Sequence, residues 1–358
     1  MKTDKLFQKA EGFRQKNHYA ESLFFFKKAL KGYQTTQNSE GVLACQLSLG
    51  DVYRMAGNFD LAEKSYSDAI TTGVKINDKV AISDARINLG LSLRGKGDWG
   101  SALKIFNETL KFYRKKNDLP ATAFTLWAIA GALRIKGDII KSIKTYNESL
   151  EIFKSLKFRP GTGYSLCGLG GTSRVAGLFN ESLKYYTSAN RLFSGIKDNF
   201  GLAYSYCGIG NAFRMLGEYN KALSNFSKAS SLYKKIGDVV SYSYTIWSTG
   251  TTHKMLGNYP AARNCFKMAG SLFRKTKDPR GSIYCMLGLG ELALLEGRKI
   301  MAEKYMITSL SSASKYGFKV EKCHSEILLS LLHGKSKTGC YNKLGLKLNF
   351  EKVPFNIP

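Results

Sequence analysis

The sequence has few of the residues on which disulfide frameworks, metal centres and catalytic sites are built. Its seven cysteines are an odd number, are widely spaced and include no C-x-x-C pair. We therefore expect neither a disulfide framework nor a zinc site, and predict a reducing compartment, the cytoplasm. Only four histidines are present, and the G-x-S-x-G, H-E-x-x-H and P-loop lysine motifs are absent. The expectation is a protein with no catalytic residues, no metal and no cofactor, which is not an enzyme.

Long apolar runs are also missing, and acidic residues are scarce. No uninterrupted apolar stretch reaches the ~18 residues of a membrane span, and the start MKTDKLFQKAEGF lacks the apolar core of a signal peptide. Across 358 residues, 27 Asp and Glu stand against 54 Lys and Arg, so the net charge is +27. Such an excess attracts acidic partners, whether nucleic acid, anionic membrane or acidic peptide.

What the sequence does contain is an internal repeat of 40 residues. A first series of small residues recurs at this spacing: Ala10, Gly50, Gly90, Ala130, Gly170, Gly210, Gly250 and Gly290. A second series follows seven residues later: Asn17, Gly57, Gly97, Gly137, Gly177, Gly217, Gly257 and Gly297. Two series in one register indicate a repeat architecture, in which each unit buries its apolar face only against its neighbours.

Each repeat reads as two helices joined at the second series. The second helix carries a small residue and then an aromatic four positions later, such as Ala62 with Tyr66 and Ala102 with Phe106. This spacing places both side chains on one helical face. An aspartate closes most repeats and is predicted to cap the following helix: Asp78, Asp118, Asp198, Asp238 and Asp278, with Phe158 and Phe318 as exceptions.

These motifs resemble the tetratricopeptide repeat (TPR), whose signature is W-x2-L-G-x2-Y followed by A-x3-F. One copy matches through Tyr206, Ile209, Gly210, Phe213, Ala222 and Phe226, and another through Leu49, Gly50, Tyr53, Ala62 and Tyr66. The repeat here has 40 residues instead of 34 and lacks a terminal proline, so it is similar to the long-helix variant of the Partner-of-Inscuteable adaptors and related bacterial proteins. The resemblance implies stacked hairpins whose first helices line a concave wall that binds other proteins.

The predicted fold is all-α, a right-handed α-solenoid of about eight stacked helix-turn-helix hairpins with a C-terminal capping helix. Residues 1–318 form the eight units of one superhelical domain, residues 319–334 the capping helix and residues 335–358 a polar tail. The oligomeric state is not readable from the sequence.

A series of cations is expected on the concave wall, four residues after the first series. Its members, called here the cation series, are Arg14, Arg54, Arg94, Arg134, Arg174, Arg214 and Lys254. Aromatic residues stand on the same wall in the later repeats: Phe124, Tyr164, Tyr204, Tyr244, Tyr284, Trp127 and Trp247, with Asn211 between Tyr204 and Arg214. Guanidinium groups grip carboxylates or phosphates through paired N–H donors.

Several interpretations of this wall remain open. The cations could serve only the stacking of repeats, as the i, i+3 pairs of Arg14 with Glu11 and Arg54 with Asp51 suggest. If the wall binds a ligand, an acidic or mixed-charge segment of another protein is favoured, and single-stranded nucleic acid is the alternative. A peptide-pheromone sensor of the repeat class is a third interpretation, disfavoured because such sensors carry an output domain and about 24 residues follow the capping helix.

The stretch GLGGTSRVAG, residues 168–177, looks at first like a phosphate-binding loop. Gly170 and Gly177 belong to the two repeated series, so the stretch is predicted to be the end of a first helix and its turn. Gly168 and Gly171 stand outside both series and weaken a helix interior. We expect them to leave room for the backbone of a ligand.

Overall fold

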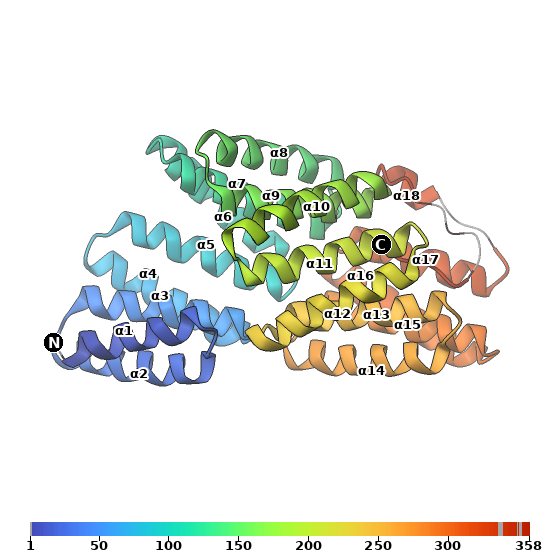
Figure 1. Cartoon of the computed structure of the whole chain (residues 1–358), viewed down its shortest axis with the longest axis horizontal. Helices are drawn as coiled ribbons and strands as arrows, with labels where there is room; N and C mark the ends of the chain where they lie inside the picture. Colours follow the sequence, from blue (N-terminus) through green and yellow to red (C-terminus); the bar gives the residue numbers. More distant parts are fainter. Residues whose placement is uncertain (1, 336–338, 349, 351–352) are drawn as a thin grey trace.

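The structure, a computed structural model, describes residues 2–335, 339–348, 350 and 353–358, and all its regular elements over these ranges are helices (Figure 1). They are α1 (Lys2–Gln15), α2 (Tyr19–Thr35), α3 (Ser39–Met55), α4 (Phe59–Lys75), α5 (Lys79–Gly95), α6 (Trp99–Lys115), α7 (Leu119–Lys136), α8 (Ile139–Ser155), α9 (Arg159–Ala176), α10 (Phe179–Ile196), α11 (Asn199–Met215), α12 (Tyr219–Ile236), α13 (Val239–Met255), α14 (Tyr259–Lys275), α15 (Pro279–Leu295), α16 (Lys299–Tyr316), α17 (Lys319–Leu332) and α18 (Gly339–Lys343). None of the helices described is long and apolar enough to cross a membrane.

Helices α1 to α16 pair consecutively into eight hairpins, and α17 packs on α15 and α16 at the end of the stack. The predicted all-α solenoid is confirmed. The first series of small residues packs against the aromatic of the second helix: a Cβ added to Gly50 would lie 2.5 Å from Tyr66 Cε1, and one on Gly90 would lie 2.5 Å from Phe106 Cε1. A side chain at Gly50 or Gly90 would therefore overlap the aromatic ring that packs there.

The turns follow the second series, because its glycines adopt the left-handed conformation that ends a helix. Gly137 has φ 95°, and the equivalent Asn17 has φ 61°; asparagine tolerates this region better than most residues. The predicted aspartate caps are confirmed: Asp118 accepts from the backbone N–H of Ala121 at 2.9 Å, and the other four make the same kind of bond.

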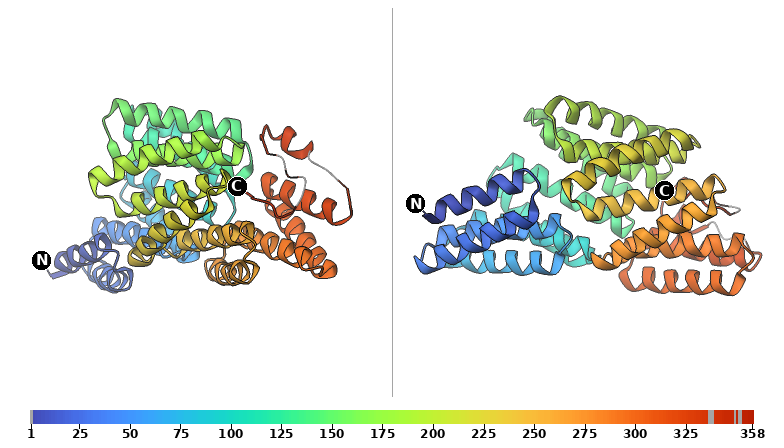
Figure 2. Two further views of the ribbon diagram at one scale, coloured as in Figure 1. Left: turned by 45° about the vertical axis from the view of Figure 1, so that its right-hand side comes forward. Right: turned by 60° about the horizontal axis from the view of Figure 1, so that its bottom comes forward.

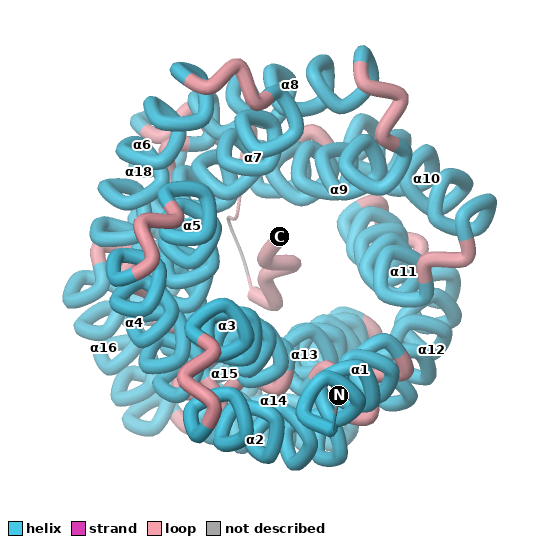
Figure 3. Tube along the Cα trace, turned by 90° about the vertical axis from the view of Figure 1, so that its left-hand side faces the viewer, coloured by secondary structure: helices cyan, strands magenta, loops and turns pink. Residues whose placement is uncertain are grey.

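The superhelix closes on itself, so that hairpins far apart in sequence touch. Trp99 Nε1 donates to the carbonyl of Tyr316 at 2.8 Å across 217 residues, between five and six repeats of 40. Lys277 pairs with Asp60 across the same separation. Figure 2 shows the first hairpins lying against those of the last third of the chain, and Figure 3 looks along the axis at a ring of helices.

The residues after α17 differ from the polar tail expected for 335–358. Tyr341 of α18, Leu346, Leu348, Phe355 and Ile357 are all buried in one apolar cluster with α15 and α17. The backbone N–H of Lys347 donates to the carbonyl of Ala176 at 2.8 Å. Figure 3 places the C-terminal end inside the ring. The apolar residues of this segment follow no helical period, so composition suggested a solvated tail.

Candidate functional site: the inner wall of the superhelix

The cation series divides into three groups by its partners. At the N-terminal end the first two arginines are neutralised within their own helices. Arg14 Nη2 lies 2.6 Å from Glu11 Oε2, and Arg54 Nη2 lies 3.8 Å from Asp51 Oδ1. These i, i+3 pairs leave little charge for a ligand.

The middle group, Arg94, Arg134 and Arg174, has no carboxylate within 4.0 Å in the part of the chain that the structure describes. Arg94 reaches the next hairpin, where Nη1 lies 3.4 Å from the carbonyl of Ala128 and the guanidinium lies 5.4 Å from the Trp127 ring. Nε of Arg134 and both Nε and Nη1 of Arg174 are shielded from solvent and lack a hydrogen-bond partner among the described residues. Buried donors of this kind are uncommon and favour an acceptor that the chain itself does not provide.

The expectation that Gly168 and Gly171 make room for a ligand backbone is wrong. A Cβ on Gly168 would overlap the ring of Tyr146, and one on Gly171 would overlap Nη1 of Arg134. Gly131 accommodates Arg94 in the same way. These glycines admit side chains of the preceding hairpin, so the middle arginines also contribute to stacking.

Most aromatic residues of the wall form hydrogen bonds to the element that follows their own hairpin. Tyr164 and Tyr244 donate to the next capping aspartates, Asp198 at 2.7 Å and Asp278 at 2.8 Å. The two indoles follow one pattern: Trp127 Nε1 donates to the carbonyl of Tyr164 and Trp247 Nε1 to that of Tyr284, both at 3.2 Å.

The remaining aromatics differ in exposure. Tyr284 is buried and donates to Glu321 at 2.7 Å. Tyr204 packs edge-on against Tyr186, with ring centroids 6.4 Å apart. Phe124 stacks on Trp127 and keeps 38% of its surface exposed, which makes it the member of the aromatic set most open to a ligand.

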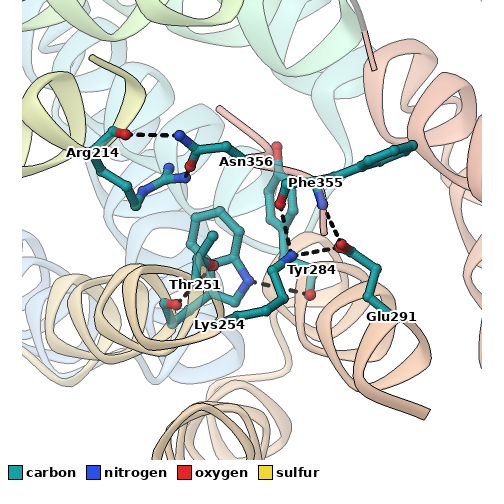
Figure 4. A network of polar contacts seen from close by, with 8 residues as sticks. Arg214, Thr251, Lys254, Tyr284, Glu291, Phe355 and Asn356 are labelled. Carbon is teal, nitrogen blue, oxygen red and sulfur yellow. Dashed lines mark hydrogen bonds and ion pairs between the residues drawn. The ribbon is translucent and has the colours of Figure 1, made fainter. Parts of the chain in front are cut away.

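The last two cations hold the segment Val353–Pro358, which runs along the wall over α11, α13 and α15 (Figure 4). Arg214 Nη1 donates to Asn356 Oδ1, and Asn356 Nδ2 donates back to the carbonyl of Arg214 at 2.7 Å. Asn211 Oδ1 accepts from Arg214 Nη2 at 3.0 Å and so orients the guanidinium.

One residue earlier, Lys254 and Glu291 bind both polar groups of a single residue's backbone. Lys254 Nζ donates to the carbonyl of Phe355 at 2.7 Å, and Glu291 Oε2 accepts from the N–H of Phe355 at 2.6 Å. The same two side chains pair with each other at 2.6 Å, with exposures of 1% and 0%. We call Asn211, Arg214, Lys254 and Glu291 the tail site.

Burial shifts the pKa of every charged side chain of the tail site. It lowers the pKa of Arg214 to about 9, aided by the neighbouring charge of Arg174. It also lowers the pKa of Lys254 and raises that of Glu291, while the attraction between these two opposes both shifts. The charged forms therefore depend on one another and on the segment that covers them.

The sequence analysis named Asn211, Arg214 and Lys254 as wall residues but did not single out Phe355 and Asn356. An aromatic followed by asparagine near the end of the chain is too common to have signalled a role. It also missed a cluster away from the wall, in which Cys323, Glu326 and Cys340 bring potential ligand atoms within 4.8 Å of one another. Cys323 and Cys340 lie on different helices, so their sequence spacing gave no hint.

Comparison with known proteins supports the repeat fold. A tetratricopeptide-repeat family model matches residues 44–115 and 81–155. No curated protein matches the sequence. The chain is a repeat protein of the TPR type.

Solved structures with similar folds cover most of the chain. A Rap protein complexed with Competence and Sporulation Factor shares 12% identity and a TM-score of 0.61, over 93% of this chain and 98% of that one. The Rap conjugation gene regulator of the plasmid pLS20, in complex with the Phr* peptide, shares 10% identity and a TM-score of 0.68, over 88% and 95%. Aspartyl phosphate phosphatase F from Bacillus subtilis shares 13% identity and a TM-score of 0.58, over 80% and 75%. At these identities the likeness concerns the fold.

Proposed function

We propose that the protein is a non-catalytic interaction scaffold that binds an extended, acidic or mixed-charge segment of a partner protein on the inner wall of its superhelix. The observation that carries the proposal is the tail site, where wall side chains hold a non-helical segment. Lys254 and Glu291 contact the carbonyl and N–H of Phe355, groups that every non-proline residue offers. Side chains that bind peptide backbone in this way are suited to an extended ligand.

The preference for acidic groups rests on the middle of the cation series. Arg94, Arg134 and Arg174 occupy equivalent positions on α5, α7 and α9, and lack carboxylate partners among the described residues. A guanidinium gains most from a carboxylate when solvent is excluded, because charge-assisted hydrogen bonds strengthen there. Acidic side chains of a bound segment would supply the acceptors that Arg134 and Arg174 lack.

The structural likeness to peptide-bound Rap regulators supports a peptide ligand. It also weakens the argument that disfavoured a peptide sensor, because the similarity extends over 98% and 95% of the two Rap chains. The wall chemistry is the same for a free peptide and for a segment of a larger partner.

Single-stranded nucleic acid is the alternative, favoured by the net charge of +27. The aromatic set argues against it, because Tyr164, Tyr244 and Tyr284 are engaged by carboxylates of the following elements. Few faces then remain free for the base stacking on which such binding depends.

Fluorescence anisotropy distinguishes the two functions. The probes are a labelled peptide library with fixed Asp or Glu positions, its Lys counterpart, and single-stranded RNA and DNA, each measured across a salt series. The double variant Arg134→Gln/Arg174→Gln is compared with Lys144→Glu/Lys184→Glu, which changes exposed cations of α8 and α10. Circular dichroism checks that both remain helical.

The proposal expects acidic peptides to bind the wild type and the outer-face variant alike. It expects the inner-wall variant to lose at least ~10-fold in affinity, since each lost charge-assisted bond is worth about 1.5–3 kcal/mol. Tight binding of nucleic acid with a steep salt dependence, weakened by the outer-face variant, would refute it.

A further inference from the structure

The tail site binds more than peptide backbone. Asn356 accepts from Arg214 Nη1 through Oδ1 and donates to the Arg214 carbonyl through Nδ2. A carboxamide offers an acceptor and a donor on the same planar carbon, so it can make both bonds at once. An aspartate in its place would leave the Arg214 carbonyl without this donor, and an alanine would remove both the acceptor for Arg214 Nη1 and this donor to the carbonyl.

The residue before the asparagine is also specified. The Phe355 ring is 1% exposed and stacks on Phe350, with centroids 4.8 Å apart and planes at 21°. Its N–H and carbonyl are the two backbone groups bound by Glu291 and Lys254. The tail site, with Phe350 beside it, therefore favours an aromatic followed by asparagine in a backbone outside any helix.

We propose that the tail site is a peptide-binding subsite for this aromatic–asparagine pattern, that Val353–Pro358 occupies it as a tethered ligand, and that a partner peptide with the same pattern binds by displacing this segment. The inference rests on the proposed function, because it assigns one part of the inner wall to a defined ligand chemistry.

The way the segment is held favours a ligand over a permanent part of the core. It is in no helix, and its polar contacts in Figure 4 run to Arg214 of α11, Lys254 of α13 and Glu291 of α15. Phe355 and Ile357 of the segment pack in the apolar cluster with α15 and α17, but a segment needed only for packing would not be met by charged wall residues as well. Here it is matched by the pair of Lys254 and Glu291, whose burial is unfavourable unless hydrogen bonds compensate it. The bond from Lys347 to Ala176 fixes the preceding chain independently, so the segment can leave while its tether stays.

Tethering sets how strongly the segment competes. A short tether gives an effective concentration in the millimolar range. For a peptide with a dissociation constant of about 10 μM, the segment would then weaken binding in trans by about 100-fold.

The test uses the full chain and a fluorescein-labelled peptide VPFNIP, a copy of residues 353–358. The double variant Phe355→Ala/Asn356→Ala releases the segment, and Asn342→Ala, an exposed asparagine of α18, is the matched control. We expect the released variant to bind the peptide about 100-fold more tightly than the wild type and the control. Adding Arg214→Met to the released variant, or changing the peptide asparagine to aspartate, should lower the affinity at least ~10-fold.

A second measurement covers the case in which the released variant fails to fold. Hydrogen exchange of the wild-type chain is followed at the Phe355 N–H, which Glu291 protects. Excess unlabelled VPFNIP should accelerate this exchange, whereas a scrambled peptide should not. Equal affinity of VPFNIP for all variants, no binding to a folded released variant, or exchange unchanged by the peptide would overturn the inference. Loss of acidic-peptide binding in the anisotropy experiment would instead refute the proposed function.

Discussion

Replacing Lys254 by methionine should strongly destabilise the region around α13 and α15. The substitution preserves most of the side-chain volume but removes the cation that faces Glu291 at 2.6 Å, where both side chains are at most 1% exposed. Glu291 keeps the N–H of Phe355 as a donor and loses its counter-charge. Breaking a buried pair in this way typically decreases stability by about 3–5 kcal/mol.

The geometry sets an upper limit on this loss. If the unpaired carboxylate is too unfavourable, Val353–Pro358 can withdraw and let water reach Glu291, so the loss cannot exceed the free energy that holds the segment. The double variant Lys254→Met/Glu291→Leu removes both charges and should lie within about 1 kcal/mol of the wild type. A coupling energy of at least about 2–4 kcal/mol follows from the loss in Lys254→Met alone, and any loss in Glu291→Leu adds to it.

Urea unfolding followed by tryptophan fluorescence measures these differences, because Trp247 lies beside the site and packs against Tyr284, with the two ring centroids 4.7 Å apart. Hydrogen exchange assigns the change to α13 and α15, which is necessary because long repeat arrays need not unfold in one step. Single variants that each lose less than about 1 kcal/mol, or a double variant that loses the sum of both, would refute the reasoning.

Three further predictions concern the fold. Gly168→Ala should destabilise the protein by about 1–3 kcal/mol in urea unfolding, because the new Cβ overlaps Tyr146. Gly12→Ala in α1, where nothing lies within 4 Å of the new Cβ, should stabilise the protein by up to ~1 kcal/mol. Equal effects of the two substitutions would contradict this packing. Trp99→Phe should cost about 1 kcal/mol and raise hydrogen exchange at α6 and α16, since it removes the bond to Tyr316; unchanged exchange would speak against contact between superhelical turns. Hydrogen bonds from Lys277 and Lys96 lower the pKa of Asp60 to about 2. The stability that this contact contributes is therefore present above the ordinary pKa of 3.8 and is lost as the pH falls towards 2. An NMR titration of the Asp60 carboxyl with a midpoint near 3.8 would be inconsistent with this prediction.

The local features of the fold were predictable from the sequence because the residues that cause them recur in successive repeats. A glycine at the first series, a glycine at the turn and an aspartate cap each have a short-range physical cause, and Gly50, Gly137 and Asp118 behave as expected. The closure of the superhelix was not predictable. It depends on a small rotation per hairpin, which accumulates until Trp99 meets Tyr316.

For the candidate site, the sequence predicted only which positions of each repeat face the inner wall. Spacing placed Arg94 and Arg214 at equivalent positions, but their environments differ because one reaches the next hairpin and the other is covered by Asn356. Which member of the cation series is covered depends on the path of the last residues of the chain, whose apolar side chains follow no helical period. The role of Gly171 was misjudged for a related reason, since the arginine that fills its space comes from 37 positions earlier, at Arg134.

Site-specific photocrosslinking tests most directly whether ligands bind the inner wall. A benzophenone amino acid is introduced at Phe124, 38% exposed on the first helix α7, or at Phe24, 52% exposed on the second helix α2. Each chain is irradiated with a biotinylated acidic peptide selected from the library. The account predicts crosslinking from position 124, suppressed by excess unlabelled peptide, and none above background from position 24. Crosslinking from position 24 alone, or equally from both positions, would contradict it.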